Sequence, residues 1–469
     1  NLQIKSSSEK FRRLLKRNRL KIAFFSMKLL PLFLLPLAAT AQQRYNIVYI
    51  MTDDHTAQMM SCYDNRYVET PNLDRIAADG VKFVNSYVAN SLSGPSRACM
   101  LTGKHSHKNG FTNNEHGVFD GSQQTMPKLL QKVGYQTAII GKWHLVSTPT
   151  GFDFWNIVPG QGDYYNPTFI NMDNSHVTEK GYLTNIVTDK AIDWMEHKRD
   201  RSKPFALFIH HKACHRDWLP EMKYLHEYED KTFALPDNFY DNYEGREAAK
   251  TQEMEIANND HMDIVYDVKM DRPGLKTRLS DSYHNMVQRL DSTDLNAYNA
   301  FYYALSADFY SRNLKGKELA EFKYQRYMRD YAKVLKSLDD NVGRTLDYLE
   351  KAGLLDSTLV VYTSDQGFYM GEHGWFDKRY MYEESFSTPL VMHLPKGLNA
   401  KGEISEMVQN IDYAPTFLEL AGAKNPADIQ GESLVPGQAP EELAQELVLP
   451  LLRIPRRTRR EASLRCKNR

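Results

Sequence analysis

Four apolar runs, each followed at once by charged or polar residues, constrain what this 469-residue chain can fold into. The runs are rich in β-branched and aromatic residues, which predicts buried strands. They cover residues 45–51, 135–140, 205–209 and 358–363. Helical periodicity marks other segments, such as residues 325–352. The sequence therefore predicts an α/β fold with a large, mixed and mostly parallel sheet sandwiched by helices.

Two adjacent carboxylates, Asp53 and Asp54, follow the first run. Sites in open α/β sheets lie beyond the carboxyl ends of the strands. Neighbouring like charges after a core strand are costly unless a cation joins them, and carboxylate oxygens suit calcium or magnesium. The alternative is a pair of unpaired surface aspartates. The position directly after a buried strand favours a metal site.

Basic and histidine side chains follow the second and third runs. Lys142 and His144 are two residues apart beyond a strand, so they project to one side, either at a surface or in a site. The segment 210–218 holds three histidines, a composition often found in zinc sites. Trp218, at its end, suits a sugar subsite or the core.

The segment Ser93-Gly94-Pro95-Ser96-Arg97, followed by Leu101-Thr102-Gly103, indicates a loop that delivers a side chain onto the first turn of a helix. Free backbone N–H groups and the helix dipole favour negative charge there. Arg97 would add a fixed cation with planar donors. An ordinary helix capped by Ser93 or Ser96 is the alternative.

This motif resembles the signature of the type I, formylglycine-dependent sulfatases of the alkaline phosphatase superfamily, and similar features recur in order from about residue 45 to residue 431. The resemblance implies an alkaline-phosphatase-like fold. It also implies that Ser93 is oxidised to formylglycine, whose hydrated aldehyde is the nucleophile. The serine form implies a radical-type bacterial maturase as a partner.

The resemblance also implies roles for residues beyond Ser93. It implies a calcium ion held by Asp53, Asp54, Asp365 and Gln366. It implies sulfate contacts from Arg97, Lys142 and Lys378. It makes Asp365 the acceptor of a proton from the formylglycine diol and His144 the group that removes the second one. His215 faces the leaving oxygen, with His210 and Lys212 in support, and Cys214 stands where the family commonly has proline.

The ends of the chain differ in composition from its middle. Residues 1–41 read as an upstream segment followed by a signal peptide that starts at Met27, which predicts a periplasmic or secreted protein. Its apolar core is short and contains two prolines, which argues against a stable membrane span. Without its nine basic residues and one acidic residue, the chain has eight more acidic than basic residues, so no nucleic-acid partner is indicated.

Residues 42–431 are expected to form the sulfatase domain, and residues 432–469 an atypical tail. From residue 447 the tail has eight basic residues against one Glu. We interpret it as the product of a frameshift that truncated a small antiparallel C-terminal subdomain. Residues 222–325 are expected to be an insertion that caps the site, and residues 151–167 a packed aromatic loop or a stacking surface for sugars. The four cysteines show no metal or disulfide spacing, so mostly free thiols are expected.

The resulting hypothesis is an exported, exo-acting carbohydrate sulfatase, most similar to bacterial N-acetylglucosamine-6-sulfatases that act on glycosaminoglycan or mucin glycans. Other sulfatase specificities, for 2-O- or N-sulfate, and phosphonate or phosphate-ester hydrolysis are alternatives within the same fold. An inactive carbohydrate-binding relic is the alternative from another functional class.

Overall fold

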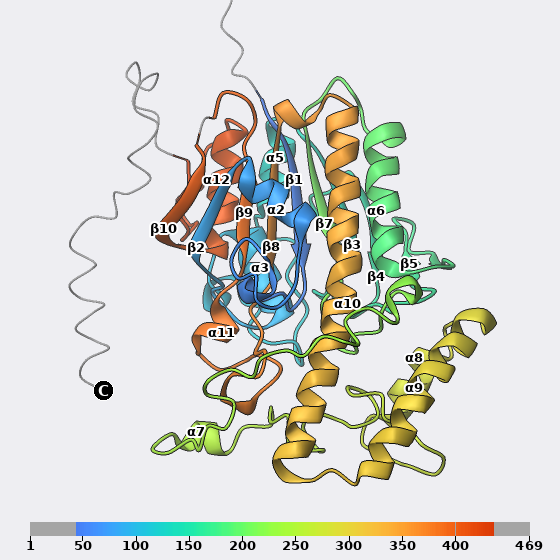
Figure 1. Cartoon of the computed structure of the whole chain (residues 1–469). Helices are drawn as coiled ribbons and strands as arrows, with labels where there is room; N and C mark the ends of the chain where they lie inside the picture. The colour runs from blue at the N-terminus through green and yellow to red at the C-terminus, as the bar shows by residue number, and fades with distance from the viewer. Residues whose placement is uncertain (1–43, 399, 436–469) are drawn as a thin grey trace, which may run out of the picture. The chain divides into compact units, whose positions relative to one another are not determined.

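A mixed sheet forms the centre of the computed structural model, which describes residues 44–398 and 400–435 (Figure 1). Its strands are β1 (Asn46–Thr52), β2 (Val81–Tyr87), β3 (Gln136–Lys142), β4 (Phe154–Val158), β5 (Thr168–Ile170), β6 (His176–Thr178), β7 (Phe205–His210), β8 (Thr358–Ser364), β9 (Leu390–His393) and β10 (Gly402–Gln409). Their order across the sheet is β10-β2-β9-β8-β1-β7-β3-β4-β5-β6. The central strands β8, β1, β7, β3 and β4 are parallel, while β9, β5 and β6 run antiparallel to their neighbours. The mixed, mostly parallel sheet is confirmed.

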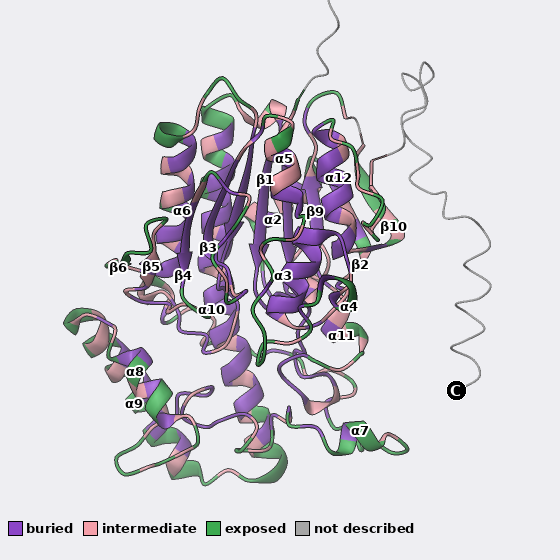
Figure 2. Ribbon diagram, turned by 180° about the vertical axis from the view of Figure 1, so that it is seen from behind, coloured by how far each residue is buried: buried purple, intermediate pink, exposed green. Residues whose placement is uncertain are grey.

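Helices cover both faces of the sheet. The helices of the described residues are α2 (Pro71–Ala78), α3 (Ser93–Thr102), α4 (Ser106–Asn109), α5 (Met126–Lys132), α6 (Leu183–Asp193), α7 (Glu247–Lys250), α8 (Ser280–Val287), α9 (Ser292–Arg312), α10 (Gly316–Lys351), α11 (Glu383–Phe386) and α12 (Tyr413–Leu420). One hydrophobic core lies under α2, α6 and α10, and a second lies under α3, α5 and α12. Alternate residues of β1 enter the two cores, with Val48 and Ile50 on one side and Ile47 and Tyr49 on the other. Figure 2 shows the resulting burial of the central strands on both faces.

The predicted strands and helices are found, with shifted ends and several additions. The helix expected over 325–352 begins at Gly316, because its apolar stripe continues into residues that pack on the insertion. The aromatic stretch 151–167 contains strand β4, which pairs with β3. The apolar residues of 386–392 also predict a strand, and β9 begins only at Leu390, because Phe386 is the last residue of the short helix α11.

The insertion 222–325 is largely ordered and contains α7, α8 and α9. In α9, aromatic residues occur on more than one side of the helix and blur its hydrophobic periodicity. Asp291 caps the N-terminus of this helix by accepting from the backbone N–H groups of Thr293 and Asp294. The insertion lies beyond the carboxyl ends of the central strands, beside one end of α10 (Figures 1 and 2). It therefore lies at the edge of the sheet where the site was expected.

The predicted upstream segment, signal peptide and most of the basic tail lie outside the described residues. No helix in the described part of the chain is long and apolar enough to cross a bilayer. Cys62, Cys99 and Cys214 are free thiols, as expected, and Cys466 lies outside the described residues.

Candidate active site

The carboxyl ends of four parallel strands and the first turn of α3 form one buried cluster. Register places Thr52 of β1 beside Ser364 of β8, and Met51 beside His210 of β7. The polar residues that follow these strands therefore meet at one edge of the sheet.

Ser93 is the first residue of α3 and is 1% exposed. Its Oγ donates to Asp53 Oδ1 at 3.1 Å and accepts from Gln366 Nε2 at 3.4 Å. The residue preceding the helix is Leu92, which makes no side-chain capping bond. Ser93 therefore faces a carboxylate rather than capping the helix, and the simple N-cap alternative does not describe it.

Position 94 has no room for a side chain, because Asn114 and Phe111 lie against Gly94. An added Cβ would lie 2.7 Å from Asn114 Oδ1 and 2.7 Å from a ring carbon of Phe111. The Gly94 N–H donates to Asn114 Oδ1 at 3.1 Å. A loop outside the motif thus satisfies one of the free N–H groups at the start of the helix.

Arg97, one turn after Ser93, is buried at the same face of α3. Its Nε and Nη2 contact Asp365 Oδ2 at 3.0 and 2.8 Å, and its Nη1 donates to the Lys142 carbonyl at 2.9 Å. Planar donors of this kind fix geometry better than a single ammonium. The carboxylate that accepts from Ser93 is Asp53, whereas Asp365, the expected proton acceptor, is paired with Arg97.

Two lysines lie on the paired carboxylates that follow β1. The Lys142 ammonium contacts Asp53 and also donates to Gln161 Oε1. Lys378 Nζ donates to both oxygens of Asp54, at 2.6 and 2.7 Å. Burial raises the pKa of Asp54 to about 6 against the opposing charge of Lys378, and burial lowers the pKa of Lys142 well below its usual value. Buried carboxylates and buried cations thus lie together at the N-terminus of α3.

The cluster offers oxygen ligands for a hard cation. Ligand atoms of Asp53, Asp54 and His215 lie within 4.8 Å of one another. Gln366 Nε2 donates to Asp53 Oδ1 at 3.2 Å and also to Asp54, and its Oε1 has no partner among the described residues. Asp365 Oδ1 accepts from the Asp54 N–H at 3.4 Å, so it lies next to the cluster. Two carboxylates and an unused amide oxygen fit calcium or magnesium better than a softer metal.

Two histidines lie on either side of this cluster. His144 Nε2 is 3.2 Å from Gln161 Nε2, and burial together with the charge of Lys142 lowers the pKa of His144 to about 2. His215 Nδ1 is 2.6 Å from the Arg216 carbonyl, and its Nε2 is 3.8 Å from Asp54 Oδ2. Burial also lowers the pKa of His215 well below its usual value. Burial thus favours the neutral form of both imidazoles in this arrangement.

The segment 210–218 does not form a zinc site. Among the described residues, the metal-ligand grouping includes only one of its histidines, His215. His210 lies beside Arg97 and the Lys142 carbonyl instead. Cys214, in the place of the expected proline, donates its N–H to the Asp53 carbonyl at 2.6 Å, which ties this turn to the end of β1. Trp218 is fully buried, so its role is in the core.

Sequence reasoning missed Gln161 and Asn114. Gln161 accepts from Lys142 and contacts His144, and Asn114 accepts from Gly94. Both lie in loops between regular elements, and the only sequence signal was a polar residue flanked by Gly160 and Gly162. Such positions acquire a role only through tertiary contacts.

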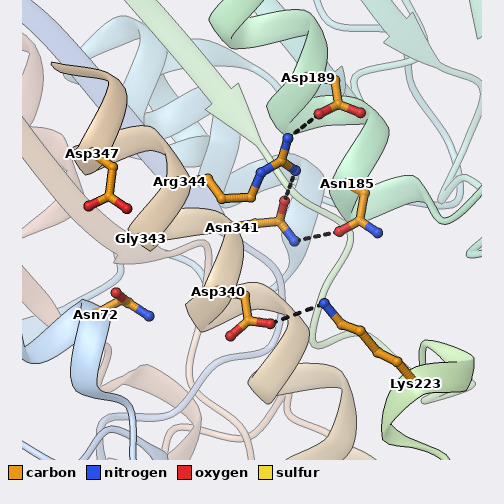
Figure 3. A pocket seen from close by; sticks show the side chains of 9 residues that line it. All are labelled: Asn72, Asn185, Asp189, Lys223, Asp340, Asn341, Gly343, Arg344 and Asp347. Atoms are coloured by element: carbon orange, nitrogen blue, oxygen red, sulfur yellow. Dashed lines mark hydrogen bonds and ion pairs between the residues drawn. The ribbon is translucent and has the colours of Figure 1, made fainter. Parts of the chain in front are cut away.

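A separate pocket of about 540 Å³ lies between α2, α6 and α10, on the face of the sheet opposite α3 (Figure 3). Its polar side chains pair with one another across it. Arg344 contacts Asp189, Lys223 Nζ lies 3.1 Å from Asp340 Oδ2, and Asn341 donates to Asn185 at 2.7 Å. These pairs join helices, and none of the candidate site residues lines the pocket.

Comparisons with known proteins agree with this arrangement. The Sulfatase family profile matches residues 45–423. The chain is 49% identical over 422 residues to an N-acetylglucosamine-6-O-sulfatase of Bacteroides thetaiotaomicron, covering 88% of this chain and 75% of that protein. It is similar, with a TM-score of 0.79 and 50% identity, to the structure of BT4656 in complex with its substrate D-glucosamine-2-N,6-O-disulfate, over 83% of this chain and 79% of that one.

More distant structures show the same fold. A phosphonate monoester hydrolase from Silicibacter pomeroyi is similar with a TM-score of 0.57 at 18% identity, over 83% of this chain and 76% of that one. The family match spans both the α3 motif and the strand ends that hold the acidic cluster. The chain belongs to the sulfatase family.

Proposed function

We propose that this sulfatase hydrolyses the 6-O-sulfate of N-acetylglucosamine in glycosaminoglycan or mucin glycans, with formylglycine formed from Ser93 as the nucleophile. The observation that carries the reaction type is the position of Ser93. It is buried at a helix N-terminus, 3.1 Å from Asp53, with Arg97, Lys142 and Lys378 in the same cluster. The proposed sugar substrate is inferred from the relative from B. thetaiotaomicron and from the disulfated glucosamine bound in the similar structure.

The cations of the cluster suit the charge of a sulfate ester. Arg97, Lys142 and Lys378 are buried donors that already face carboxylates, so they need little reorganisation to stabilise the anion. Calcium, when held by Asp53, Asp54, Gln366 and Asp365, would act as a Lewis acid beside the nucleophile. These carboxylates would balance both the metal ion and the lysines.

Formylglycine at position 93 would supply a hydrated aldehyde whose hydroxyl attacks sulfur. Asp53 is the nearest carboxylate to that position and is placed to hold the proton of the attacking hydroxyl. Burial favours the neutral form of His144, and the negative charge of the bound sulfate would offset the surrounding cations when its ring takes the second hydroxyl proton and the aldehyde returns as sulfate leaves.

His215 is placed to protonate the leaving alcohol oxygen. A carbonyl oxygen can only accept, so Nδ1 carries a hydrogen in the bond to the Arg216 carbonyl, and Nε2 faces the acidic cluster. The acid form is therefore the imidazolium, which the negative charge of a bound sulfate ester would favour, and its Nε2 hydrogen would pass to the leaving oxygen and leave the ring neutral. A sugar alkoxide is a poor leaving group, so it needs this proton. The assignment predicts a larger effect of His215 on sugar sulfates than on aryl sulfates.

The test has two parts. Peptide mass spectrometry across Ser93, on protein from a host that carries a maturase, should show a loss of about two mass units, as expected for conversion of the alcohol to the aldehyde. The protein should then release sulfate from N-acetylglucosamine 6-sulfate but not from 2-O-sulfated uronate or N-sulfated glucosamine, and Ser93→Ala should release none. Unmodified Ser93 in such a host would favour the carbohydrate-binding relic.

The shared fold of the phosphonate monoester hydrolase keeps a second candidate activity open for testing, because both tetrahedral anions fit a cationic cluster. Phenyl phosphonate esters are the probe, and faster turnover of these esters than of the sulfated sugar would replace our proposal. We further propose that residues 27–41 are a cleaved signal peptide that exports the enzyme, and that a frameshift produced the tail after residue 431. N-terminal sequencing and resequencing of the coding DNA test these two points.

A further inference from the structure

The group that holds the His215 ring is a main-chain carbonyl. His215 Nδ1 donates to the Arg216 carbonyl oxygen at 2.6 Å, and Lys212 Nζ approaches the same oxygen at 3.4 Å. The His215 carbonyl in turn accepts from the Tyr164 hydroxyl at 2.8 Å. The direction of Nε2 therefore depends on the orientation of the peptide unit that follows Arg216.

The side chain of Arg216 fixes that peptide unit to the insertion. Its Nε donates to Asp267 Oδ1 at 2.9 Å, and its Nη2 contacts Asp267 Oδ2. The guanidinium also lies over the rings of Phe376 and Tyr266, at 5.1 and 5.6 Å from their centroids. A bidentate pair of this kind sets the position of Arg216 in two directions.

Asp267 itself is rigidly held. Its side chain is fully buried, and its Oδ2 accepts from the Asp263 N–H at 2.8 Å. Asp263 accepts from the N–H groups of Val265 and Tyr266 within the same turn, and from the Thr277 hydroxyl and the Leu279 N–H outside it. The turn around residues 263–270 is thus a compact block on which Arg216 is anchored.

The same insertion also pairs with the segment that leads to Lys378. Phe376 donates its N–H to the Met254 carbonyl, and Ile256 donates to the Gly374 carbonyl, both at 2.9 Å. The insertion therefore contacts the neighbours of both His215 and Lys378. Its contacts with the site run through Arg216 on one side and through the main chain of 374–376 on the other.

We propose that Asp267 is a positioning residue for the leaving-group acid, and that it acts on His215 through the Arg216 side chain and carbonyl. The inference rests on the role of His215 in the proposed function. Asp267 touches none of the residues placed at the sulfate, and we expect the main part of its effect to pass through His215. This gives the insertion a part in the chemistry in addition to covering the site.

A double-mutant cycle tests the inference. Asp267→Asn is measured alone and in a His215→Ala background, with N-acetylglucosamine 6-sulfate as substrate. In the wild-type background we expect kcat to fall by about 10- to 100-fold, because a displaced acid loses much of its contribution. In the His215→Ala background we expect a change of less than about 2-fold. Equal losses in the two backgrounds would overturn the inference.

The leaving group provides an independent readout. Nitrophenolate leaves without protonation, so Asp267→Asn should lower kcat on 4-nitrophenyl sulfate by less than about 3-fold. Equal losses on both esters would also overturn the inference. Glu229→Gln is the matched control, since Glu229 of the insertion forms a similar bidentate pair with Arg326 of α10 and also accepts from Lys333, without contacting His215. We expect it to leave both activities within about 2-fold of wild type.

Two further measurements separate folding and function. If Asp267→Asn does not fold, as judged by thermal unfolding, Arg216→Lys replaces it, because lysine keeps the charge but not the bidentate contact. It should show the same dependence on leaving group. If His215→Ala alone keeps wild-type activity on the sugar sulfate, the proposed role of His215 fails, and the inference fails with it. That outcome is distinguishable because it is seen without any change at Asp267.

Discussion

Replacing Gln161 tests whether a loop side chain sets the geometry of the cationic cluster. Gln161 Oε1 accepts from the Lys142 ammonium, and its Nε2 lies 3.2 Å from His144 Nε2. Gln161→Ala removes both contacts. A hydrogen bond to a charged group contributes about 1.5–3 kcal/mol, so we expect kcat/KM on N-acetylglucosamine 6-sulfate to fall by about 10- to 100-fold.

Comparing Gln161→Glu with Gln161→Ala tests the effect of negative charge at this position. Gln161→Glu keeps an acceptor for Lys142 but adds a negative charge where the sulfate must bind, so it should lower kcat/KM more than Gln161→Ala does. Inhibition by free sulfate should weaken in the same order. Asp163→Asn is the control, because Asp163 lies in the same loop and pairs with Arg289 at 3.3 Å. Activity of Gln161→Ala within 2-fold of wild type would refute the reasoning.

Four other predictions follow from the same geometry. Gly94→Ala should lower both activity and Tm, because the added Cβ lies 2.7 Å from Asn114 Oδ1 and 2.7 Å from a ring carbon of Phe111; wild-type kcat/KM and Tm in this variant would contradict the close packing. Arg97→Lys should lower kcat by about 100-fold or more, since an ammonium cannot make its contacts to Asp365 and the main chain together. Chelation should lower both Tm and sulfate release, and added calcium should restore both; an unchanged Tm would count against a bound ion. Burial raises the pKa of Asp339 to about 6. Between about pH 4 and 6 the folded state therefore binds more protons than the unfolded state, and the free energy of unfolding falls as the pH rises. Asp339→Asn should make this free energy, measured by urea unfolding, depend less on pH.

The parts of the site that lie at strand ends could be predicted from the sequence. Parallel strands must bring their carboxyl ends to one edge, so the residues after β1, β3, β7 and β8 could be expected to meet. The continuous apolar runs indicated the strands themselves, because a strand that is buried on both faces needs apolar residues at every position. The resemblance added the identity of the nucleophile position, Ser93, and the roles assigned to the cluster remain predictions.

The contacts made by loops and by the insertion could not be predicted in this way. Gln161 reaches Lys142 only because β4 pairs with β3 and carries the following loop to the site. Asp267 reaches Arg216 only after the whole insertion has packed against α10. Helix α9 was missed because its aromatic residues are distributed around it and blur the periodicity. Sequence periodicity reports burial within one element, and these contacts depend on which elements become neighbours.

Every residue of α3 is buried, including Ser93 at its start. Another protein cannot bring its own catalytic centre to a side chain that is 1% exposed. If Ser93 is oxidised as we propose, the oxidising enzyme must reach it while the segment is still an extended peptide. Maturation and folding would then compete for the same stretch of chain, and a molecule that folds first would keep a serine. The active fraction of a preparation should then depend on how fast it was made, and not only on whether the maturase was present.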